Sequence, residues 1–464
     1  MPSGAPRHRL RSPRKEGICL DLLVWIFIRP LWRCVVDAQG TVCGRHRFPL
    51  TRDTLTAWAR QLTAEDAVAL EATTNTWAVV ALLQQTPARL VVSNPLRTRA
   101  IATAKIKTDR VDAEVLAQLL RCDYLPPVWI PDAATLAARR LTTRRSVLVA
   151  ERTRLKNRLH SVLHQLLLPC PVADLFSRTG LAWLATVEVP AAERAAVDAD
   201  CRLLTAIDQE LVALEQTQVV DAAADPRIRL LLTLPGLDVA VATALLAAIG
   251  EVSRFPTPAR LAAYLGLVPS VRQSAQHCYT GHITKQGASH VRWLLVQAAQ
   301  HLDRHPGPLG AFVRKLLRRK NRNIAIVAAA RKLVTLAWHV LRTGAPYRYA
   351  MPRVTQEKLA RLRRRATGVR RRSGPSAGTP RTATYGTGQR TRGIPALATV
   401  YQQEGLPAPG PAPAAETRVV ALDQAVHQFV TSLHSVQRQP RSARFTAETS
   451  VERHSRQVDK PKPG

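Results

Sequence analysis

Four acidic side chains stand at positions where they could share a metal ion. Asp21 lies inside the apolar run ICLDLLVWIFI, and Glu71 closes the shorter apolar run AVALE. An ionised carboxylate in such a run is costly to bury without a partner or a cation. Asp109 and Asp112 are three residues apart in KTDRVDAEVL, so a helix would hold both on one face.

Carboxylates at these places suit metal-assisted cleavage of phosphodiesters. Their oxygens are hard ligands of the kind that Mg²⁺ prefers. Two such ions about 4 Å apart can stabilise both the attacking and the leaving oxygen of the reaction. The ordinary alternative is structural, with Asp109 as a helix N-cap, Asp112 as an acid favoured by the helix dipole, and Glu71 as a surface residue at a strand end. Spacing alone leaves both interpretations open.

The composition indicates a polyanionic partner. The 464 residues include 67 Lys and Arg against 33 Asp and Glu, a formal net charge of +34. Such a field attracts nucleic acid, or less often an anionic membrane surface. Lys105, Lys107 and Arg110 flank the acidic pair, and we expect them to contact phosphate. The seven cysteines are scattered without a CxxC pair, which favours a reducing compartment over a disulfide framework.

Residues 17–131, which must position the four acids, alternate between strand and helix patterns. The apolar run around Asp21 is too short to span a bilayer and has no small-residue cleavage site after it, so we expect a buried strand. The segment RCVVDAQGTVCGRHRF predicts a hairpin that turns at Gln39-Gly40. DRVDAEVLAQLLRCD carries an apolar stripe at helical spacing. The alternation predicts a mixed α/β sheet.

The other regions differ from this one in composition and periodicity. We expect a disordered basic N-terminus over 1–16, a helical or coiled-coil arm over 132–225, an all-α domain over 226–348, and a basic, mostly disordered tail over 349–464. Two long helical patterns within the arm predict an antiparallel pair. Within the tail, one isolated amphipathic helix is expected near VVALDQAVHQFVTSLHSV.

The all-α domain opens with a helix, a tight turn and a second helix. LPGLDVAVATALLAAIG, residues 234–250, places Pro235 and Gly236 at that turn and resembles a helix-hairpin-helix element. Backbone N–H groups at such a turn can hold a DNA phosphate without reading sequence. The alternative is a plain helical hairpin with no ligand.

A polar segment further on carries serines among basic residues. VPSVRQSAQHCYTGHITKQG predicts a polar loop or a short hairpin, followed by the amphipathic helix HVRWLLVQAAQHL. A serine beside Arg272, Lys285 and Arg292 is a candidate nucleophile toward phosphate, with the cations stabilising the developing charge. Serines in loops more often form turns or are simply solvated.

These motifs resemble those of the DEDD transposases of insertion-sequence family 110, which are related to the Piv/MooV invertases. NPLRTRAIATAKIKTDRVDAEVLAQLL and the upstream ALEAT carry the N-terminal likeness, and AAYLGLVPS, GHITKQG and the following helix carry the C-terminal one. The resemblance implies an RNase H-like, Holliday-resolvase-like N-terminal domain. It places the four metal ligands on Asp21, Glu71, Asp109 and Asp112, and the catalytic serine on Ser274, with Ser270 as runner-up.

The resemblance also implies an activity and partners. The expected activity is that of a transposase or site-specific recombinase that needs Mg²⁺ and forms a covalent phosphoserine–DNA intermediate. The implied partners are element and target DNA duplexes, a structured guide RNA encoded by the element, and further copies of the chain in a dimer or tetramer. The expected location is the bacterial cytoplasm, near the nucleoid, with no membrane. Two alternatives remain, a Holliday-junction-type nuclease that uses water and a decayed, non-catalytic transposase that still binds nucleic acid.

Overall fold

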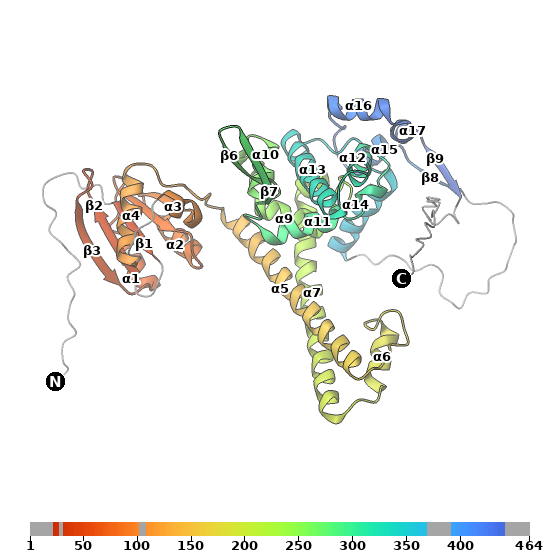
Figure 1. Cartoon of the computed structure of the whole chain (residues 1–464), viewed down its shortest axis with the longest axis horizontal. Helices are drawn as coiled ribbons and strands as arrows, with labels where there is room; N and C mark the ends of the chain where they lie inside the picture. Colours follow the sequence, from red (N-terminus) through yellow and green to blue (C-terminus); the bar gives the residue numbers. More distant parts are fainter. Residues whose placement is uncertain (1–21, 27–30, 102–107, 369–390, 441–464) are drawn as a thin grey trace, which may run out of the picture. The chain divides into compact units, whose positions relative to one another are not determined.

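The structure is a computed structural model that describes residues 22–26, 31–101, 108–368 and 391–440 (Figure 1). The chain divides into two compact units, residues 1–131 and residues 132–464. Each unit is described by itself below.

Unit 1 contains a five-stranded mixed sheet with the strand order β3-β2-β1-β4-β5. The strands are β1 (Leu22–Ile26), β2 (Leu31–Val36), β3 (Val42–Phe48), β4 (Ala67–Glu71) and β5 (Arg89–Ser93). β2 is antiparallel to both β1 and β3, whereas β4 is parallel to both β1 and β5. The hairpin predicted around Gln39-Gly40 is confirmed as the β2–β3 connection, where Asp37 Oδ1 accepts a hydrogen bond from the Thr41 N–H at 2.8 Å.

Helices cover both faces of this sheet (Figure 1). They are α1 (Arg52–Ala59), α2 (Thr76–Leu83), α3 (Pro95–Ile101) and α4 (Asp109–Arg121). Successive residues of a strand point to opposite faces. Accordingly Val68 and Leu70 of β4 join the core with α1 and α2, while Ala69 joins the core with α4. The mixed α/β expectation for this part of the chain is confirmed.

Unit 2 begins with two long helices that run antiparallel. The elements are α5 (Ala133–Gln165), α6 (Arg178–Thr186) and α7 (Ala191–Ala224), with α5 and α7 side by side and α6 at their far end (Figure 1). Ion pairs join Arg158 to Asp200, Arg152 to Asp208 and Arg145 to Glu215, so residue numbers fall on α7 as they rise on α5. A separate apolar core that includes Leu159, Leu163 and Leu184 packs at the α6 end.

The body of unit 2 is mainly helical and shares one large apolar core. Its helices are α8 (Pro226–Leu232), α9 (Val239–Ile249), α10 (Pro258–Tyr264), α11 (Ser289–Ala299), α12 (Pro308–Leu317) and α13 (Arg322–Thr343), with short 3-10 turns η1 (Val252–Arg254) and η2 (Leu302–Arg304). α13 is long and apolar enough to cross a membrane. Leu333, Val334 and Ala337 of this helix are 0% exposed in the shared core, as expected of the central helix of a folded domain.

Two differences from the sequence prediction occur in unit 2. The body is not all-α, because β6 (Pro269–Ser274) and β7 (His277–Ile283) form a hairpin, which is the second of the two forms that the polar segment predicted. The stretch expected to be a mostly disordered tail contains α14 (Pro352–Thr367), β8 (Thr391–Ile394), α15 (Leu397–Gln403), α16 (Ala414–Leu422), α17 (Gln424–Ser432) and β9 (Gln437–Pro440). Leu359, Leu362 and Tyr401 bury in the shared core, and this burial orders their helices despite the basic composition around them.

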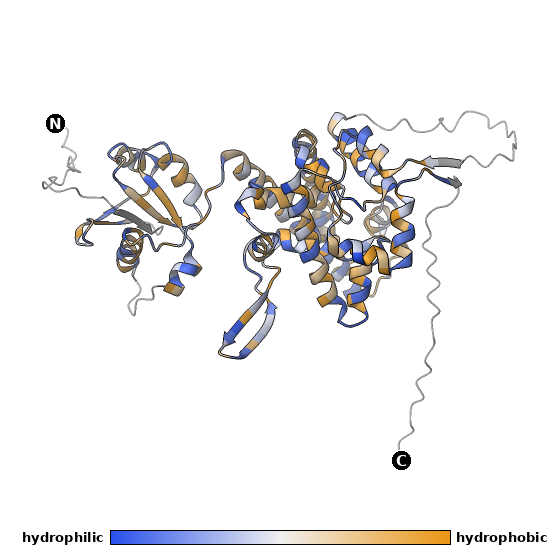
Figure 2. Cartoon of the chain, turned by 90° about the horizontal axis from the view of Figure 1, so that it is seen from above, coloured by the Kyte–Doolittle hydropathy of each residue, from blue (hydrophilic) through white to orange (hydrophobic). Residues whose placement is uncertain are grey.

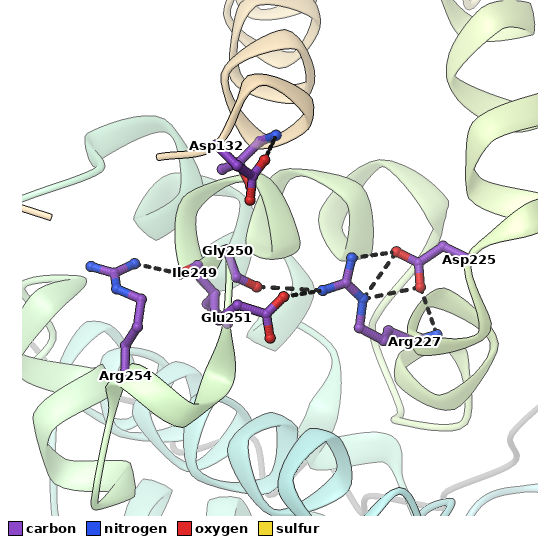
Figure 3. Close-up of polar contacts among 8 residues, drawn as sticks. Asp132, Asp225, Arg227, Ile249, Gly250, Glu251 and Arg254 are labelled. Atoms are coloured by element: carbon purple, nitrogen blue, oxygen red, sulfur yellow. Dashed lines mark hydrogen bonds and ion pairs between the residues drawn. The ribbon is translucent and has the colours of Figure 1, made fainter. Parts of the chain in front are cut away.

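Arginines fasten the two-helix arm to the body at the C-terminal end of α9. The last carbonyls of a helix have no partner within it. Arg139 of α5 donates to the carbonyls of Ala247 and Ala248, at 2.8 and 3.0 Å. Figure 3 shows the next two carbonyls, at residues 249 and 250, accepting from Arg254 and Arg227 respectively. The negative end of the helix dipole favours these cations.

Candidate active site and nucleic-acid interface

The two acids three residues apart both lie in the first turn of α4, as predicted. The N-cap is Thr108, whose Oγ1 accepts a hydrogen bond from the Val111 N–H at 3.3 Å. Asp109 is therefore the first helical residue and not the cap, so the capping alternative is wrong for it. Asp109 and Asp112 are both half-buried. Arg110 between them is exposed, where a phosphate can reach it.

Glu71 is the last residue of β4, as the sequence predicts, and is half-buried. Its donor chemistry suits Mg²⁺ as well as that of the α4 acids does. In the described part of the chain, however, no three His, Cys, Asp or Glu side chains converge as a metal-binding group. The structure thus brings Asp109 and Asp112 together and does not gather Glu71 with them.

Asp21, Lys105 and Lys107 lie outside the described residues. The strand that follows Asp21, β1, is nevertheless described, and so is its pairing with β4. Leu22 lies opposite Ala67, the first residue of β4, and Glu71 is the last residue of that strand. At about 3.3 Å per residue, the start of β1 and Glu71 are about 13 Å apart along the β1–β4 pair.

The β6–β7 hairpin presents the predicted serine nucleophile. The hairpin projects from the helical body (Figure 2), and its residues 270–282 are all exposed. Ser274 closes β6 and pairs with His277 across the turn. Ala275 within the turn has φ +49°, a left-handed conformation that costs a residue with a Cβ about 1–2 kcal/mol. The position after Ser274 thus favours glycine.

The two candidate serines differ in their contacts. Ser270 Oγ donates to the carbonyl of His282 at 3.2 Å. A Cβ added at Gly281 would come within 2.5 Å of Ser270 Oγ. Ser270 is therefore held against the opposite strand. Ser274 Oγ has no hydrogen-bond partner among the residues that the structure describes. The contacts favour Ser274 as the hydroxyl that is open to a substrate.

The three cations predicted around the serine have different surroundings. Arg272 on β6 and Lys285 after β7 are exposed. Arg292 on α11 is only half-exposed, and its Nη1 donates to the carbonyls of Leu265 and Gln286, at 3.1 and 3.0 Å. Arg292 therefore braces the backbone at the base of the hairpin, a role that the sequence did not predict.

The predicted helix, tight turn and second helix are confirmed: α8 precedes the turn at Pro235 and Gly236, and α9 follows it. Gly236 in this turn is exposed and has φ +78°. A Cβ at this position would lie 2.4 Å from the carbonyl oxygen of Ala298 on α11, so the turn packs directly against that helix. Asp238 caps α9 by accepting from the Val241 N–H at 2.8 Å.

A cavity of about 480 Å³ beside this turn is absent from the sequence prediction. Basic residues line it, namely His301, Arg304, His305 and Lys358. The sequence carries no signal for this grouping, because Lys358 belongs to the stretch that was expected to be a disordered tail.

Comparisons with known proteins agree with these features. A family model of the IS110 DEDD type, described as "Transposase", matches residues 29–168, and one described as "Transposase IS116/IS110/IS902 family" matches residues 228–314. The first match begins after Asp21 and includes Glu71 and the α4 acids. The second includes the Gly236 turn and the serine hairpin.

Curated relatives include transposases and one inverting protein. The chain is 29% identical over 256 residues to a "Probable family 20 transposase" of Pseudomonas aeruginosa, covering 52% of this chain and 74% of that protein. It is 27% identical over 255 residues to the "Transposase for insertion sequence element IS1328" of Yersinia enterocolitica, covering 52% and 73%. A shorter likeness, 32% over 125 residues, covers 26% of this chain and 38% of the "Pilin gene-inverting protein" of Moraxella bovis. The chain belongs to the IS110/IS116/IS902 family of transposases.

Proposed function

We propose that this transposase cuts and rejoins the DNA of its insertion element through Ser274. The observation that carries the proposal is the projecting β6–β7 hairpin, where Ser274 Oγ is open while Ser270 is bonded to the opposite strand. Arg272 is exposed on the same strand and Lys285 is exposed just beyond the hairpin, so both can meet a phosphate group.

The proposed reaction is two successive transesterifications. Ser274 Oγ attacks the scissile phosphorus, the bond to the leaving DNA oxygen breaks, and a phosphoserine–DNA linkage forms. The serine proton passes to water, and a proton from water returns to the leaving alkoxide. A DNA hydroxyl from the new partner then attacks the same phosphorus and releases the serine. Arg272 and Lys285 stabilise the negative charge on the phosphate oxygens.

We further propose that the carboxylates of unit 1 bind Mg²⁺. Their hard oxygens and their places at the end of β4 and in the first turn of α4 support this assignment. Asp109 and Asp112 would hold the ion, and the family resemblance adds Glu71 and Asp21, of which Glu71 does not converge with the α4 acids in the described structure. Bound Mg²⁺ supplies positive charge that favours deprotonation of a hydroxyl and stabilises the leaving oxygen.

The proposal includes a finer fold assignment and partners. The sheet order β3-β2-β1-β4-β5, antiparallel on one side of β1 and parallel on the other, supports an RNase H-like domain for unit 1. The exposed Gly236 turn supports a helix-hairpin-helix role in phosphate binding. We also propose duplex DNA and an element-encoded guide RNA as partners, a dimer or tetramer for strand exchange, and the bacterial cytoplasm as the site of action.

Denaturing gel electrophoresis of the protein with labelled element-end DNA, candidate guide RNA and Mg²⁺ tests the serine. The expected result is a protein–DNA adduct with the parent and with Ser270→Ala, and no adduct with Ser274→Ala. Ser270→Ala is the matched control because it removes a hydroxyl from the same hairpin. Strand cleavage by Ser274→Ala would rule out the serine mechanism and favour a nuclease that uses water.

A second candidate, a non-catalytic transposase that still binds nucleic acid, has its own support. The family match begins at residue 29, after Asp21, and the described carboxylates do not converge as a metal site. This candidate predicts salt-sensitive DNA binding by the parent with no Mg²⁺-dependent cleavage under any condition. One cleavage product that disappears with Asp109→Ala would exclude it.

A further inference from the structure

The cavity of about 480 Å³ in unit 2 is built from three segments that are distant in sequence: the α8–α9 turn, the stretch from the end of α11 through η2, and the start of α14. The α8–α9 turn contributes Gly236, and the end of α11 contributes Gln297. The segment around η2 contributes His301, Arg304 and His305, and α14 contributes Lys358. The walls therefore combine the exposed backbone of the turn with basic side chains and with apolar ones such as Leu302, Met351 and Val354, and they contain no Asp or Glu.

Lys358 brings a positive charge into this cavity without a paired acid. Its Nζ donates to the carbonyls of Leu232 and Leu234, at 3.2 and 2.8 Å, which leaves one of its three N–H bonds for another acceptor. No carboxylate of the described residues forms an ion pair with it. Burial lowers the pKa of Lys358 to about 8, against the opposing effect of Asp238, so the ammonium group remains mostly charged at pH 7.

His305 lines the cavity but keeps its free ring nitrogen buried. It is 6% exposed, and its Nδ1 accepts a hydrogen bond from the Gly307 N–H at 3.1 Å. The neutral ring must then carry its proton on Nε2. This Nε2 is buried and has no partner among the described residues. The ring lies edge-on to Phe429, with 5.7 Å between the ring centroids, so this nitrogen is out of reach of a ligand in the cavity.

The surroundings of the cavity are also cationic. Arg304 is exposed at its edge, and Arg314 of α12 donates to the carbonyls of Asp303 and His305 beneath it. Asp238 of α9 is the acid that acts on Lys358, and it is already engaged as the cap of α9. Asp303 of η2 is a second nearby acid, and its Oδ1 is buried without a partner among the described residues. The basic side chains at the cavity still outnumber these acids, which suits a tetrahedral anion.

We infer that this cavity binds a backbone phosphate of nucleic acid, with Lys358 Nζ and Arg304 donating to the phosphate oxygens. The Gly236 turn forms one wall, so a strand that rests on the turn would place an adjacent phosphate in the cavity. Lys358 lies outside residues 228–314, so the site extends the DNA-binding surface into α14. The inference rests on the proposal that the protein binds DNA, and it adds a defined phosphate site to that function.

Equilibrium binding of duplex DNA in EDTA tests the inference, because binding is then measured without any cleavage. Lys358→Met and Arg304→Met should each weaken binding at least about tenfold, as expected for a charge-assisted hydrogen bond in a partly enclosed site. The matched control is Arg361→Met, which removes an exposed cation from the same helix α14 and should weaken binding about threefold or less. Equal losses in all three variants would overturn the inference.

Folding is separated from binding by the choice of variants. Arg304 is exposed, so Arg304→Met should retain the parent's circular dichroism and melting temperature even if Lys358→Met does not. Lys358→Arg keeps the charge and should recover most of the affinity lost in Lys358→Met. If Arg304→Met and Lys358→Arg both bind like the Arg361→Met control while Lys358→Met alone is weak and misfolded, Lys358 is structural and the phosphate site is refuted.

Inorganic phosphate serves as a second probe and separates a nucleic-acid site from a site for free phosphate. At constant ionic strength, replacing chloride by phosphate should raise the melting temperature of the parent more than that of Arg304→Met. Protection by phosphate together with unchanged DNA affinity in the variants would assign the cavity to free phosphate and refute the nucleic-acid part. A loss of DNA binding in EDTA bears only on this site, whereas a missing adduct with intact binding bears only on the Ser274 mechanism.

Discussion

Acidification should destabilise unit 2 through His305, and the size of the effect follows from its surroundings. Burial, with smaller contributions from the charges of Lys358 and Arg314, lowers the pKa of His305 from 6.5 to about 4. Between these two values the unfolded chain binds a proton that the folded chain does not. The free energy of unfolding therefore falls as the pH falls through this window. At about 1.4 kcal/mol per pH unit, the loss amounts to about 3 kcal/mol on acidification from pH 7 to pH 4.

The measurement is denaturant unfolding followed by circular dichroism at several pH values between 7 and 4.5, comparing the parent with His305→Asn. The Asn side chain can still accept from the Gly307 N–H but cannot be protonated in this range. The parent should lose stability with acid more steeply than His305→Asn, by up to about 1.4 kcal/mol per pH unit within the window. Other titrating groups are common to both proteins and cancel in the difference.

The control is His282→Asn, which removes an exposed imidazole from the β6–β7 hairpin. If the pH dependence of His305→Asn equals that of the parent, His305 titrates similarly in the folded and unfolded chains, and the argument from its burial is refuted. If His282→Asn flattens the curve as much as His305→Asn does, the effect reports imidazole loss in general.

Two further substitutions test other contacts of unit 2. Gly236→Ala should destabilise the unit by about 2 kcal/mol or more, because its Cβ would lie 2.4 Å from the Ala298 carbonyl oxygen at a φ of +78°. Denaturant unfolding measures this change in the free energy of unfolding. A loss below about 0.5 kcal/mol would contradict the packing. Arg139→Met should cost about 1–3 kcal/mol, because two helix-end carbonyls lose their guanidinium donors. Protection of the amides of α5 from hydrogen exchange should fall in Arg139→Met, and unchanged protection would show that the arm is held by other contacts.

The sequence was informative where a local pattern determines the structure. The β2–β3 hairpin and helix α4 follow from alternating and helical apolar spacing, and the sheet follows from their order along the chain. The N-cap at Thr108 was missed because Thr108 and Asp109 are both plausible caps, and the choice depends on one backbone conformation. The register of β1 was also beyond prediction, because an apolar strand with no polar alternation can pair in several ways.

The cavity that we propose to bind phosphate and the ordered tail elements both depend on contacts between distant residues. Lys358 and the α8–α9 turn are more than a hundred residues apart, and no local periodicity brings them together. The helices after residue 349 bury a few apolar side chains, such as Leu359 and Tyr401, among many arginines. Composition averages over such residues, so it favoured disorder where a few long-range contacts produce order.

The attachment of the arm to α9 has a mechanical consequence. The acceptors at residues 247–250 are backbone carbonyls, so substitutions of those side chains leave the acceptors in place as long as the helix ends there. The same helix carries the Gly236 turn at its other end, about 16 Å away by helical rise. α9 is therefore a rigid connection between the arm and the turn that we propose to contact DNA. A partner that tilts the arm would also tilt the wall of the proposed phosphate site, so binding at the arm and the proposed contact with DNA would be linked through one helix.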